Sequence, residues 1–223
     1  NLGSPLIALD IISKCQASTK IESTSIEAVF IDLNYADDLH ENLKAFPWVK
    51  IISGKYEDNI GSVLRGKNGY NVFLYIDPYG IKALQCSMFD GFAKGRFNSI
   101  ELLINMNSFG FIREACHAMG TCFEDKEIFD DLVEYESTKM DASDKSIKEL
   151  NDIAGGEYWQ SIIASYKKHE INGYEAESQF AEQYCMRLME SYTYVLNMPL
   201  RIKKGQRPKY RLIHATNHRD GCL

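Results

Sequence analysis

Residues 71–80, NVFLYIDPYG, decide the fold of this chain. Five consecutive apolar residues at 72–76 form a segment that is apolar on both faces, which predicts a strand buried on both sides. Asp77, Pro78 and Gly80 follow directly and predict a turn at the carboxyl end of this strand. Strands of this kind are typical of parallel sheets, which place their chemistry just beyond the carboxyl ends of the strands.

The same pattern occurs three more times along the chain. Residues 26–34, 48–54 and 100–106 are apolar runs of strand length that end in polar residues. Stretches with helical periodicity separate these strands. We expect helices at residues 6–15, 35–46, 57–65, 81–94 and from 109 onward. Alternating strands and helices predict an α/β protein whose mostly parallel sheet is covered on both faces.

The second half of the chain has a different organisation. We expect one domain over residues 1–223, with a helical and acidic insertion at about 119–156 that contains a surface loop around 137–148. Helices at 157–168 and 173–191 follow the insertion. Two strand-like runs then flank the Gly- and Pro-containing segment RIKKGQRP, which predicts a C-terminal antiparallel hairpin.

Composition places the chain among globular proteins. The chain has 223 residues, of which 45% are hydrophobic and 25% are charged. No apolar run reaches the roughly 18 residues that a membrane-spanning helix needs, so we expect no membrane insertion. Six cysteines without a close CxxC pair are typical of a reducing compartment, which favours a cytoplasmic location and no metal site.

Charge is unevenly distributed along the chain. The net charge is −6, yet seven of the Lys and Arg residues lie within 201–223 beside a single aspartate. A local basic patch attracts phosphates over about a Debye length, roughly 8 Å. We therefore expect contact with RNA or DNA through the basic segment 201–211. The alternative is that the basic and acidic segments are solvated surfaces that keep the protein soluble.

Three strand ends carry candidate binding residues. Asp32 can accept hydrogen bonds from both hydroxyls of a ribose, or it can be a helix N-terminal acid. Ser53 and Gly54 allow a flat adenine to approach the backbone, and Asp58 can accept from its amino group, whereas the alternative is a plain turn.

The segment 77–80 is the strongest candidate for the part of the site that binds the reacting amine. Asp77 and the Pro78 carbonyl can hold the N–H groups of an amine, and Tyr79 can stack on its base. Amino methyltransferases use the pattern [D/N/S]-P-P-[Y/F] for this purpose. The alternative is an ordinary tight turn.

Five segments together resemble the three-Cys-motif partner family of bacterial and phage-associated proteins. They are GSPLIAL at 3–9, FIDLN, FLYIDPYG, IELLINMNSFGFIR and the terminal YRLIHATNHRDG. The resemblance implies a Rossmann-like class I methyltransferase fold, in which an antiparallel strand lies near the C-terminus. It also implies a partner protein with a three-cysteine cluster.

The chain is more distantly similar to ribosomal-RNA adenine-N6 methyltransferases. That similarity implies that Gly3 with Ser4, Asp32, and Ser53 with Gly54 surround S-adenosylmethionine, and that Asp77 holds the target amine. The sequence D-P-Y-G departs from D-P-P-Y, which puts the target amine in doubt. The family also has a first strand and a glycine-rich turn before the Gly-Ser-Pro-Leu run. The sequence begins at Asn1 without them, and we expect these residues to precede it.

We therefore predict a methyltransferase-like protein that uses S-adenosylmethionine on a nucleic-acid base amine, with adenine N6 as the first candidate. The alternative is a catalytically degenerate methyltransferase fold that binds a three-cysteine-motif protein. A third hypothesis is a nuclease with Mg²⁺ on Asp32 and Asp77. The first and third hypotheses require these two carboxylates to meet at one edge of the sheet.

Overall fold

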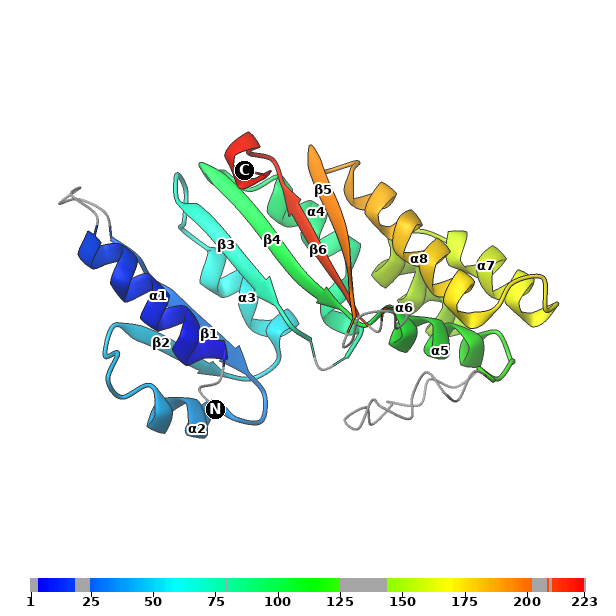
Figure 1. The fold of residues 1–223 in the computed structure, drawn as a ribbon, viewed down its shortest axis with the longest axis horizontal. Coiled ribbons are helices and arrows are strands. Elements are labelled where there is room, and N and C mark those ends of the chain that lie inside the picture. The colour runs from blue at the N-terminus through cyan, green and yellow to red at the C-terminus, as the bar shows by residue number, and fades with distance from the viewer. Residues whose placement is uncertain are drawn as a thin grey trace. The chain divides into compact units, whose positions relative to one another are not determined.

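The computed structural model describes residues 4–18, 25–78, 80–124, 144–201, 208 and 210–222. It has a mixed α/β architecture with two sheets, as Figure 1 shows. The chain divides into two compact units, Asn1–Gly66 and Lys67–Leu223. The expected α/β class is confirmed at this level.

The first unit contains a two-stranded parallel sheet. Its elements are α1 (Ser4–Ser18), β1 (Ala28–Asp32), α2 (Ala36–Asn42), β2 (Val49–Ser53) and α3 (Tyr56–Leu64). The apolar, β-branched runs AVFID and VKIIS favour strands, and they pair in parallel from Ala28 beside Val49 to Asp32 beside Ser53. Because the register ends on this last pair, Asp32 and Ser53 are neighbours at the carboxyl edge of the sheet.

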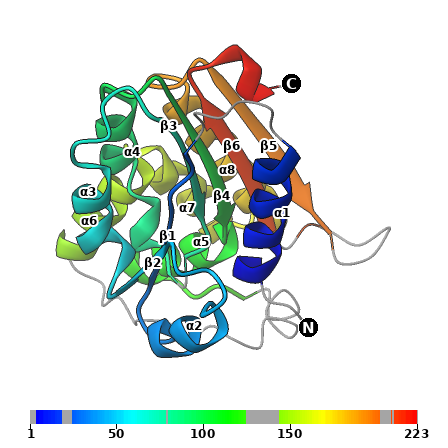
Figure 2. The same ribbon diagram turned by 90° about the vertical axis from the view of Figure 1, so that its left-hand side faces the viewer.

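The second unit contains a four-stranded sheet in the order β3-β4-β6-β5. Its strands are β3 (Asn71–Ile76), β4 (Ser99–Met106), β5 (Tyr194–Leu200) and β6 (Tyr210–Thr216). Its helices are η1 (Lys82–Leu84), α4 (Cys86–Ala93), α5 (Ser108–Ala118), α6 (Asp144–Ala154), α7 (Tyr158–Lys167), α8 (Gly173–Leu188) and η3 (Arg219–Cys222). β3 and β4 are parallel, whereas β6 is antiparallel to β4 and to β5 (Figure 2). The predicted C-terminal antiparallel hairpin is therefore confirmed.

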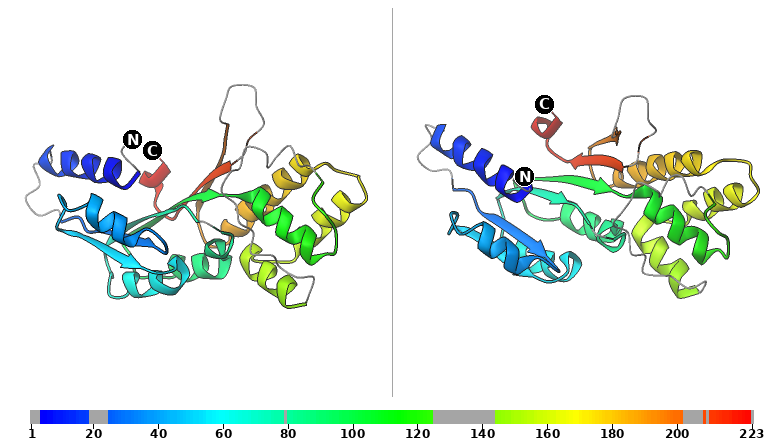
Figure 3. Two further views of the ribbon diagram at one scale, coloured as in Figure 1. Left: turned by 90° about the horizontal axis from the view of Figure 1, so that it is seen from below. Right: turned by 60° about the horizontal axis from the view of Figure 1, so that its bottom comes forward.

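One face of this sheet forms the core of the second unit. Side chains of β4 alternate between buried and half-buried, and Ile100, Leu102, Ile104 and Met106 are all on the buried side. The helices α5, α7 and α8 pack together beside the sheet (Figure 3). The alternation of burial along β4 has the period of two that places every second residue of a strand on the same face.

Aromatic rings join these helices. The Phe111 ring stacks on the Phe180 ring at 3.9 Å between centroids, and Trp159 meets Phe111 edge-on. The Trp159 indole N–H donates to the Asn151 Oδ1 at 2.8 Å, which connects α7 to α6. Phe180 and Tyr184 lie four residues apart on the buried side of α8, as the helical spacing predicts.

An ion pair joins α4 to α8. The Arg187 Nη2 donates to Asp90 Oδ2 at 2.5 Å, and its Nε donates to the Gly155 carbonyl at 3.0 Å. The Ser191 hydroxyl also donates to Asp90. Burial raises the pKa of Asp90, but the hydrogen bonds from Arg187 and Ser191 outweigh burial and hold this pKa below its ordinary value.

The other face of the sheet differs from the expected burial on both sides. Phe73 is 60% exposed and Tyr75 is 49% exposed, although both lie in the strand that was predicted to be buried. Further large apolar side chains are exposed on β5. They are Tyr194, Leu196, Met198 and Leu200. The reason is that, within the described part of the second unit, the α-helices cover the opposite face of the sheet.

The predicted insertion at 119–156 is described only at its two ends, because residues 125–143 lie outside the described ranges. Residues 144–148 belong to α6, so the prediction of a surface loop was wrong for this part. Leu150, Ile153 and Ala154 of the same helix are fully buried. The C-terminal end of the predicted insertion is therefore part of the core.

Candidate functional site

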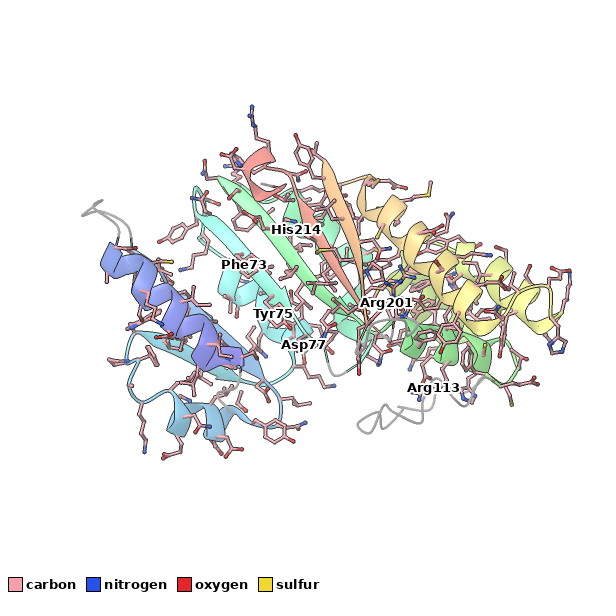
Figure 4. The ribbon with its side chains drawn as sticks, viewed as in Figure 1. Phe73, Tyr75, Asp77, Arg113, Arg201 and His214 are labelled. Carbon is pink, nitrogen blue, oxygen red and sulfur yellow. The ribbon has the colours of Figure 1, made fainter. Side chains whose placement is uncertain are left out.

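Asp77 directly follows β3 and is exposed at the carboxyl edge of the second sheet. Its Oδ1 accepts a hydrogen bond from Asn105 Nδ2 at 2.9 Å, and its Oδ2 accepts from the Tyr75 hydroxyl at 3.3 Å. Burial, together with the adjacent Asp77 carboxylate, raises the pKa of Tyr75, so this phenol remains a donor at neutral pH. Figure 4 shows Phe73, Tyr75 and Asp77 in succession along β3. The edge thus presents an exposed carboxylate that two side chains orient.

The neighbouring strand end is held by a buried ion pair. Glu177 of α8 accepts from Arg211 Nε at 2.5 Å and from Arg211 Nη2 at 2.8 Å, and the exposed fractions of the two residues are 3% and 8%. Ser108, the first residue of α5, also donates to Glu177. The Asn107 side chain caps the same helix by accepting from the Gly110 N–H at 2.9 Å. These contacts fix the turn that leaves β4 beside Asn105.

Arg201, the first residue of the predicted basic segment, lies at the same edge of the sheet as Asp77. Two antiparallel pairings separate β5 from β4, so β5 runs in the direction of β3, and Arg201 follows its carboxyl end. Arg201 is exposed (Figure 4). Arg211 is buried against Glu177 and therefore does not offer its charge to a phosphate. Residues 202–207 and 209 lie outside the described ranges.

The first unit gathers three of the predicted cofactor residues. Asp32 and Ser53 are paired in the register of β1 and β2, and the Gly54 N–H donates to the Asp32 carbonyl at 3.0 Å. Asp32 Oδ1 accepts from the backbone N–H groups of Asn34 at 2.8 Å and Tyr35 at 2.7 Å. This carboxylate therefore stabilises the turn between β1 and α2, while its Oδ2 makes no hydrogen bond within the described ranges. The alternative of a helix N-terminal acid does not describe it, because the acids in the first turn of α2 are Asp37 and Asp38.

Gly54 has a backbone conformation that requires glycine. Its φ is +139°, and an added Cβ would lie 2.7 Å from Asn59 Nδ2. Asp58 lies in the first turn of α3 and is exposed. Ser4 is the exposed first residue of α1.

Two of the predicted site residues, Gly3 and Tyr79, lie outside the described ranges. Pro78 adjoins Asp77 and is half-buried. Asp32 belongs to the first unit and Asp77 to the second, so their approach to one another stays a prediction.

Sequence reasoning assigned no role to Asn105 or to the Glu177–Arg211 pair. Asn105 does carry a local signal, because it is a polar residue between the buried Ile104 and Met106 of an apolar strand. No comparable signal joins Glu177 to Arg211, because 34 positions separate them in the sequence.

Other features of the described residues lie away from these edges. A surface hollow of about 340 Å³ beside the α7–α8 turn is lined by Glu124, Tyr166, His169 and neighbouring residues, and it includes none of the predicted site residues. The described ranges contain no group of three or more His, Cys, Asp or Glu residues placed to hold a metal ion. They also contain no helix with the length and apolar character that crossing a membrane requires. The chain matches no protein-family model, no curated protein and no solved structure.

Proposed function

We propose that this chain is a class I methyltransferase-like protein that binds S-adenosylmethionine and acts on an amino group of a nucleic-acid base, with adenine N6 as the first candidate. The observation that carries the proposal is the Asp77 carboxylate, which is exposed at a strand end and oriented by Asn105 and Tyr75. A carboxylate accepts hydrogen bonds, so it can hold the N–H groups of an amine and aim the nitrogen lone pair. The parallel pair β3–β4 followed by an antiparallel hairpin supports the Rossmann-like part of this proposal.

The first unit offers groups that fit the cofactor. Asp32 uses Oδ1 for its own turn and keeps Oδ2 for a ribose hydroxyl, and Ser53 adds a second polar group beside it. The Gly54 N–H is already bonded to the Asp32 carbonyl, so the proposed backbone partner of an adenine ring is the Gly54 carbonyl. We propose that these residues, together with Gly3, Ser4 and Asp58, form the part of the site that binds S-adenosylmethionine.

The proposed chemistry depends on positioning. S-adenosylmethionine supplies an electrophilic methyl group when it is bound. Asp77 and the Pro78 carbonyl hold the amine so that its lone pair faces that group, and Tyr79 stacks on the base. The amine loses one proton in the reaction. The exposed Asp77 carboxylate accepts this proton and passes it to solvent. Holding two reactants in a reactive geometry removes much of the entropic part of a barrier.

The polynucleotide itself is proposed to bind beside Asp77. Arg201 lies at the same edge of the sheet and is exposed. Lys203, Lys204 and Arg207 follow it in the sequence and add positive charge for phosphates. Arg211, which was included in the predicted basic segment, is excluded from this role by its ion pair with Glu177.

A second candidate function is a catalytically degenerate methyltransferase fold that binds a three-cysteine-motif protein. The observation in its favour is the exposed apolar sheet face that includes Phe73, Tyr75 and Leu196. Contiguous apolar patches of this kind often mark protein interaction sites. The sequence D-P-Y-G at residues 77–80, in place of D-P-P-Y, also favours a catalytically degenerate site.

Two measurements test the proposal. Calorimetry with S-adenosylmethionine should give binding heat that Asp32→Ala removes. Transfer of labelled methyl groups into RNA or DNA should be lost in Asp77→Ala. Asp37→Ala is the matched control for both, because Asp37 is an exposed aspartate in the first turn of α2. Absence of binding heat from the unmutated protein would contradict the methyltransferase proposal. Co-purification with a three-cysteine-motif protein, without methyl transfer, would support the second candidate.

A further inference from the structure

Strand β5 forms one edge of the four-stranded sheet (Figure 2). It pairs with β6 from Tyr194 to Leu200, and within the described ranges no strand lies on its other side. An edge strand presents backbone N–H and C=O groups with which another strand can pair. Proteins commonly block such edges with charged side chains, yet the β5 sequence YVLNMPL contains none. The edge of β5 is therefore able to pair with a further strand.

The position of Pro199 shows which backbone groups of β5 face outward. Proline has no N–H, and in an edge strand its nitrogen faces away from the paired neighbour. In an antiparallel pair, successive residues direct their backbone groups alternately toward the neighbour and away from it. Val195 and Asn197 precede Pro199 by four and two positions, so their N–H and C=O groups also face outward. Apolar side chains that are 39–48% exposed alternate along the strand, and they are Tyr194, Leu196, Met198 and Leu200.

We propose that β5 pairs with β5 of a second copy of this chain, antiparallel and centred on Asn197. This inference does not depend on the proposed function. Asn197 of each copy then donates to the Asn197 carbonyl of the other, and Val195 donates to the Pro199 carbonyl of the other, which gives about four backbone hydrogen bonds. Each copy uses the same strand, so the contact has two-fold symmetry and closes as a dimer.

The same register pairs the exposed apolar side chains between the two copies. Leu196 of one copy faces Met198 of the other, and Tyr194 faces Leu200. Cross-strand apolar pairs of this kind stabilise antiparallel strands. The opposite edge of the sheet, β3, has two large exposed apolar side chains and offers a smaller contact than the four of β5.

Charge at the two ends of β5 favours the antiparallel orientation. Glu190 precedes the strand, and its side chain is 68% exposed although it pairs with Arg187 at 3.2 Å. Arg201 follows the strand and is exposed. Antiparallel pairing places Arg201 of each copy at the end that carries Glu190 in the other, whereas parallel pairing places like charges together. Opposite charges attract within a Debye length, roughly 8 Å. The two copies therefore present complementary charges to each other.

Sedimentation of the full chain under reducing conditions tests the proposal. The mass should rise from 25.5 kDa toward twice that value between about 1 and 500 μM protein, because small interfaces are typical of weak complexes. Leu196→Lys places a charge at the junction and should raise the dissociation constant at least about ten-fold. The matched control is Phe73→Lys, which changes an exposed apolar residue on the opposite edge and should leave the constant unchanged.

Two further measurements examine the orientation and the backbone contact. Arg201→Glu should weaken the dimer about three- to ten-fold, and adding Glu190→Lys should restore it, because the second change returns opposite charges to each end. Amide hydrogen exchange at Val195 and Asn197 should slow as the protein concentration rises. The Leu196 amide faces β6 in both states, so its exchange should not change with concentration.

Several outcomes would overturn the pairing of β5 with itself. A chain that stays monomeric over the whole concentration range does so, as does a dimer that Phe73→Lys abolishes and Leu196→Lys leaves intact. Species larger than a dimer would show open-ended association instead. Protection of the Val195 and Asn197 amides in a monomeric chain only after a three-cysteine-motif protein is added would assign the edge to that partner. Hydrogen exchange of the unmutated protein decides the question if the lysine variants do not fold.

Discussion

Removing one partner of the Glu177–Arg211 pair should destabilise the second unit strongly. Both side chains are almost fully buried, and two hydrogen bonds of 2.5 and 2.8 Å join them. Arg211→Met leaves the Glu177 carboxylate buried, with Ser108 as its remaining donor among the residues that the structure describes. Loss of one member of a buried pair costs about 3–5 kcal/mol, because the other charge stays uncompensated. We expect Arg211→Met to lower the free energy of unfolding by that amount.

The double variant separates the charge effect from lost packing. Arg211→Met with Glu177→Leu removes both charges and leaves the Ser108 hydroxyl as the unsatisfied group, which costs about 1–3 kcal/mol. We therefore expect the double variant to be more stable than either single variant. Arg219→Met is the control: this arginine is 82% exposed, and its loss should change stability by less than about 0.5 kcal/mol.

Urea unfolding in a Trp48→Phe background measures these effects. Trp48 belongs to the first unit, so fluorescence then follows Trp159, which is fully buried in the second unit. The reasoning would be refuted if each single variant lost less than about 1 kcal/mol, or if the double variant lost the sum of the two single losses.

Three further predictions concern single positions. Gly54→Ala should lower the stability of the first unit by about 1–3 kcal/mol in urea unfolding, because φ is +139° and the new Cβ meets Asn59; an unchanged midpoint would contradict this. Tyr184→Phe should lower the free energy of unfolding by about 1–3 kcal/mol, because it removes the 2.6 Å bond to the Leu84 carbonyl in the core, and the same measurement checks it. The pKa of Asp90 is lowered in the folded state, so its contribution to stability is present above the ordinary aspartate pKa and disappears as pH falls through the lowered value. Unfolding free energies measured from neutral to acidic pH should therefore fall less steeply for Asp90→Asn than for the unmutated protein.

Local pattern was sufficient to predict the type and order of most described elements. The apolar runs at 26–34, 48–54 and 100–106 each contain a strand, because β-branched and aromatic side chains favour an extended, partly buried backbone. The hairpin of β5 and β6 was predicted because a Gly- and Pro-containing segment separates two strand-like runs. The polar strand ends Asp32 and Asp77 could be identified for the same local reason.

Tertiary structure decided what those residues contact. The hydrophobic period and the composition of a strand do not show which face of the sheet helices will cover. The exposure of Phe73 and Tyr75 in an apolar strand was therefore not predicted. The bond from Asn105 to Asp77 depends on the register of β3 against β4, and it joins residues 28 positions apart.

The sequence by itself determined the strands, the hairpin and the carboxylates at the strand ends, because these depend on near neighbours in the chain. Only the tertiary structure decided that Asn105 holds Asp77, that Glu177 neutralises Arg211, and that Arg201 shares an edge with Asp77. The physical reason is that hydrogen bonds and buried ion pairs act over a few ångströms in space, whatever the separation of their residues in sequence.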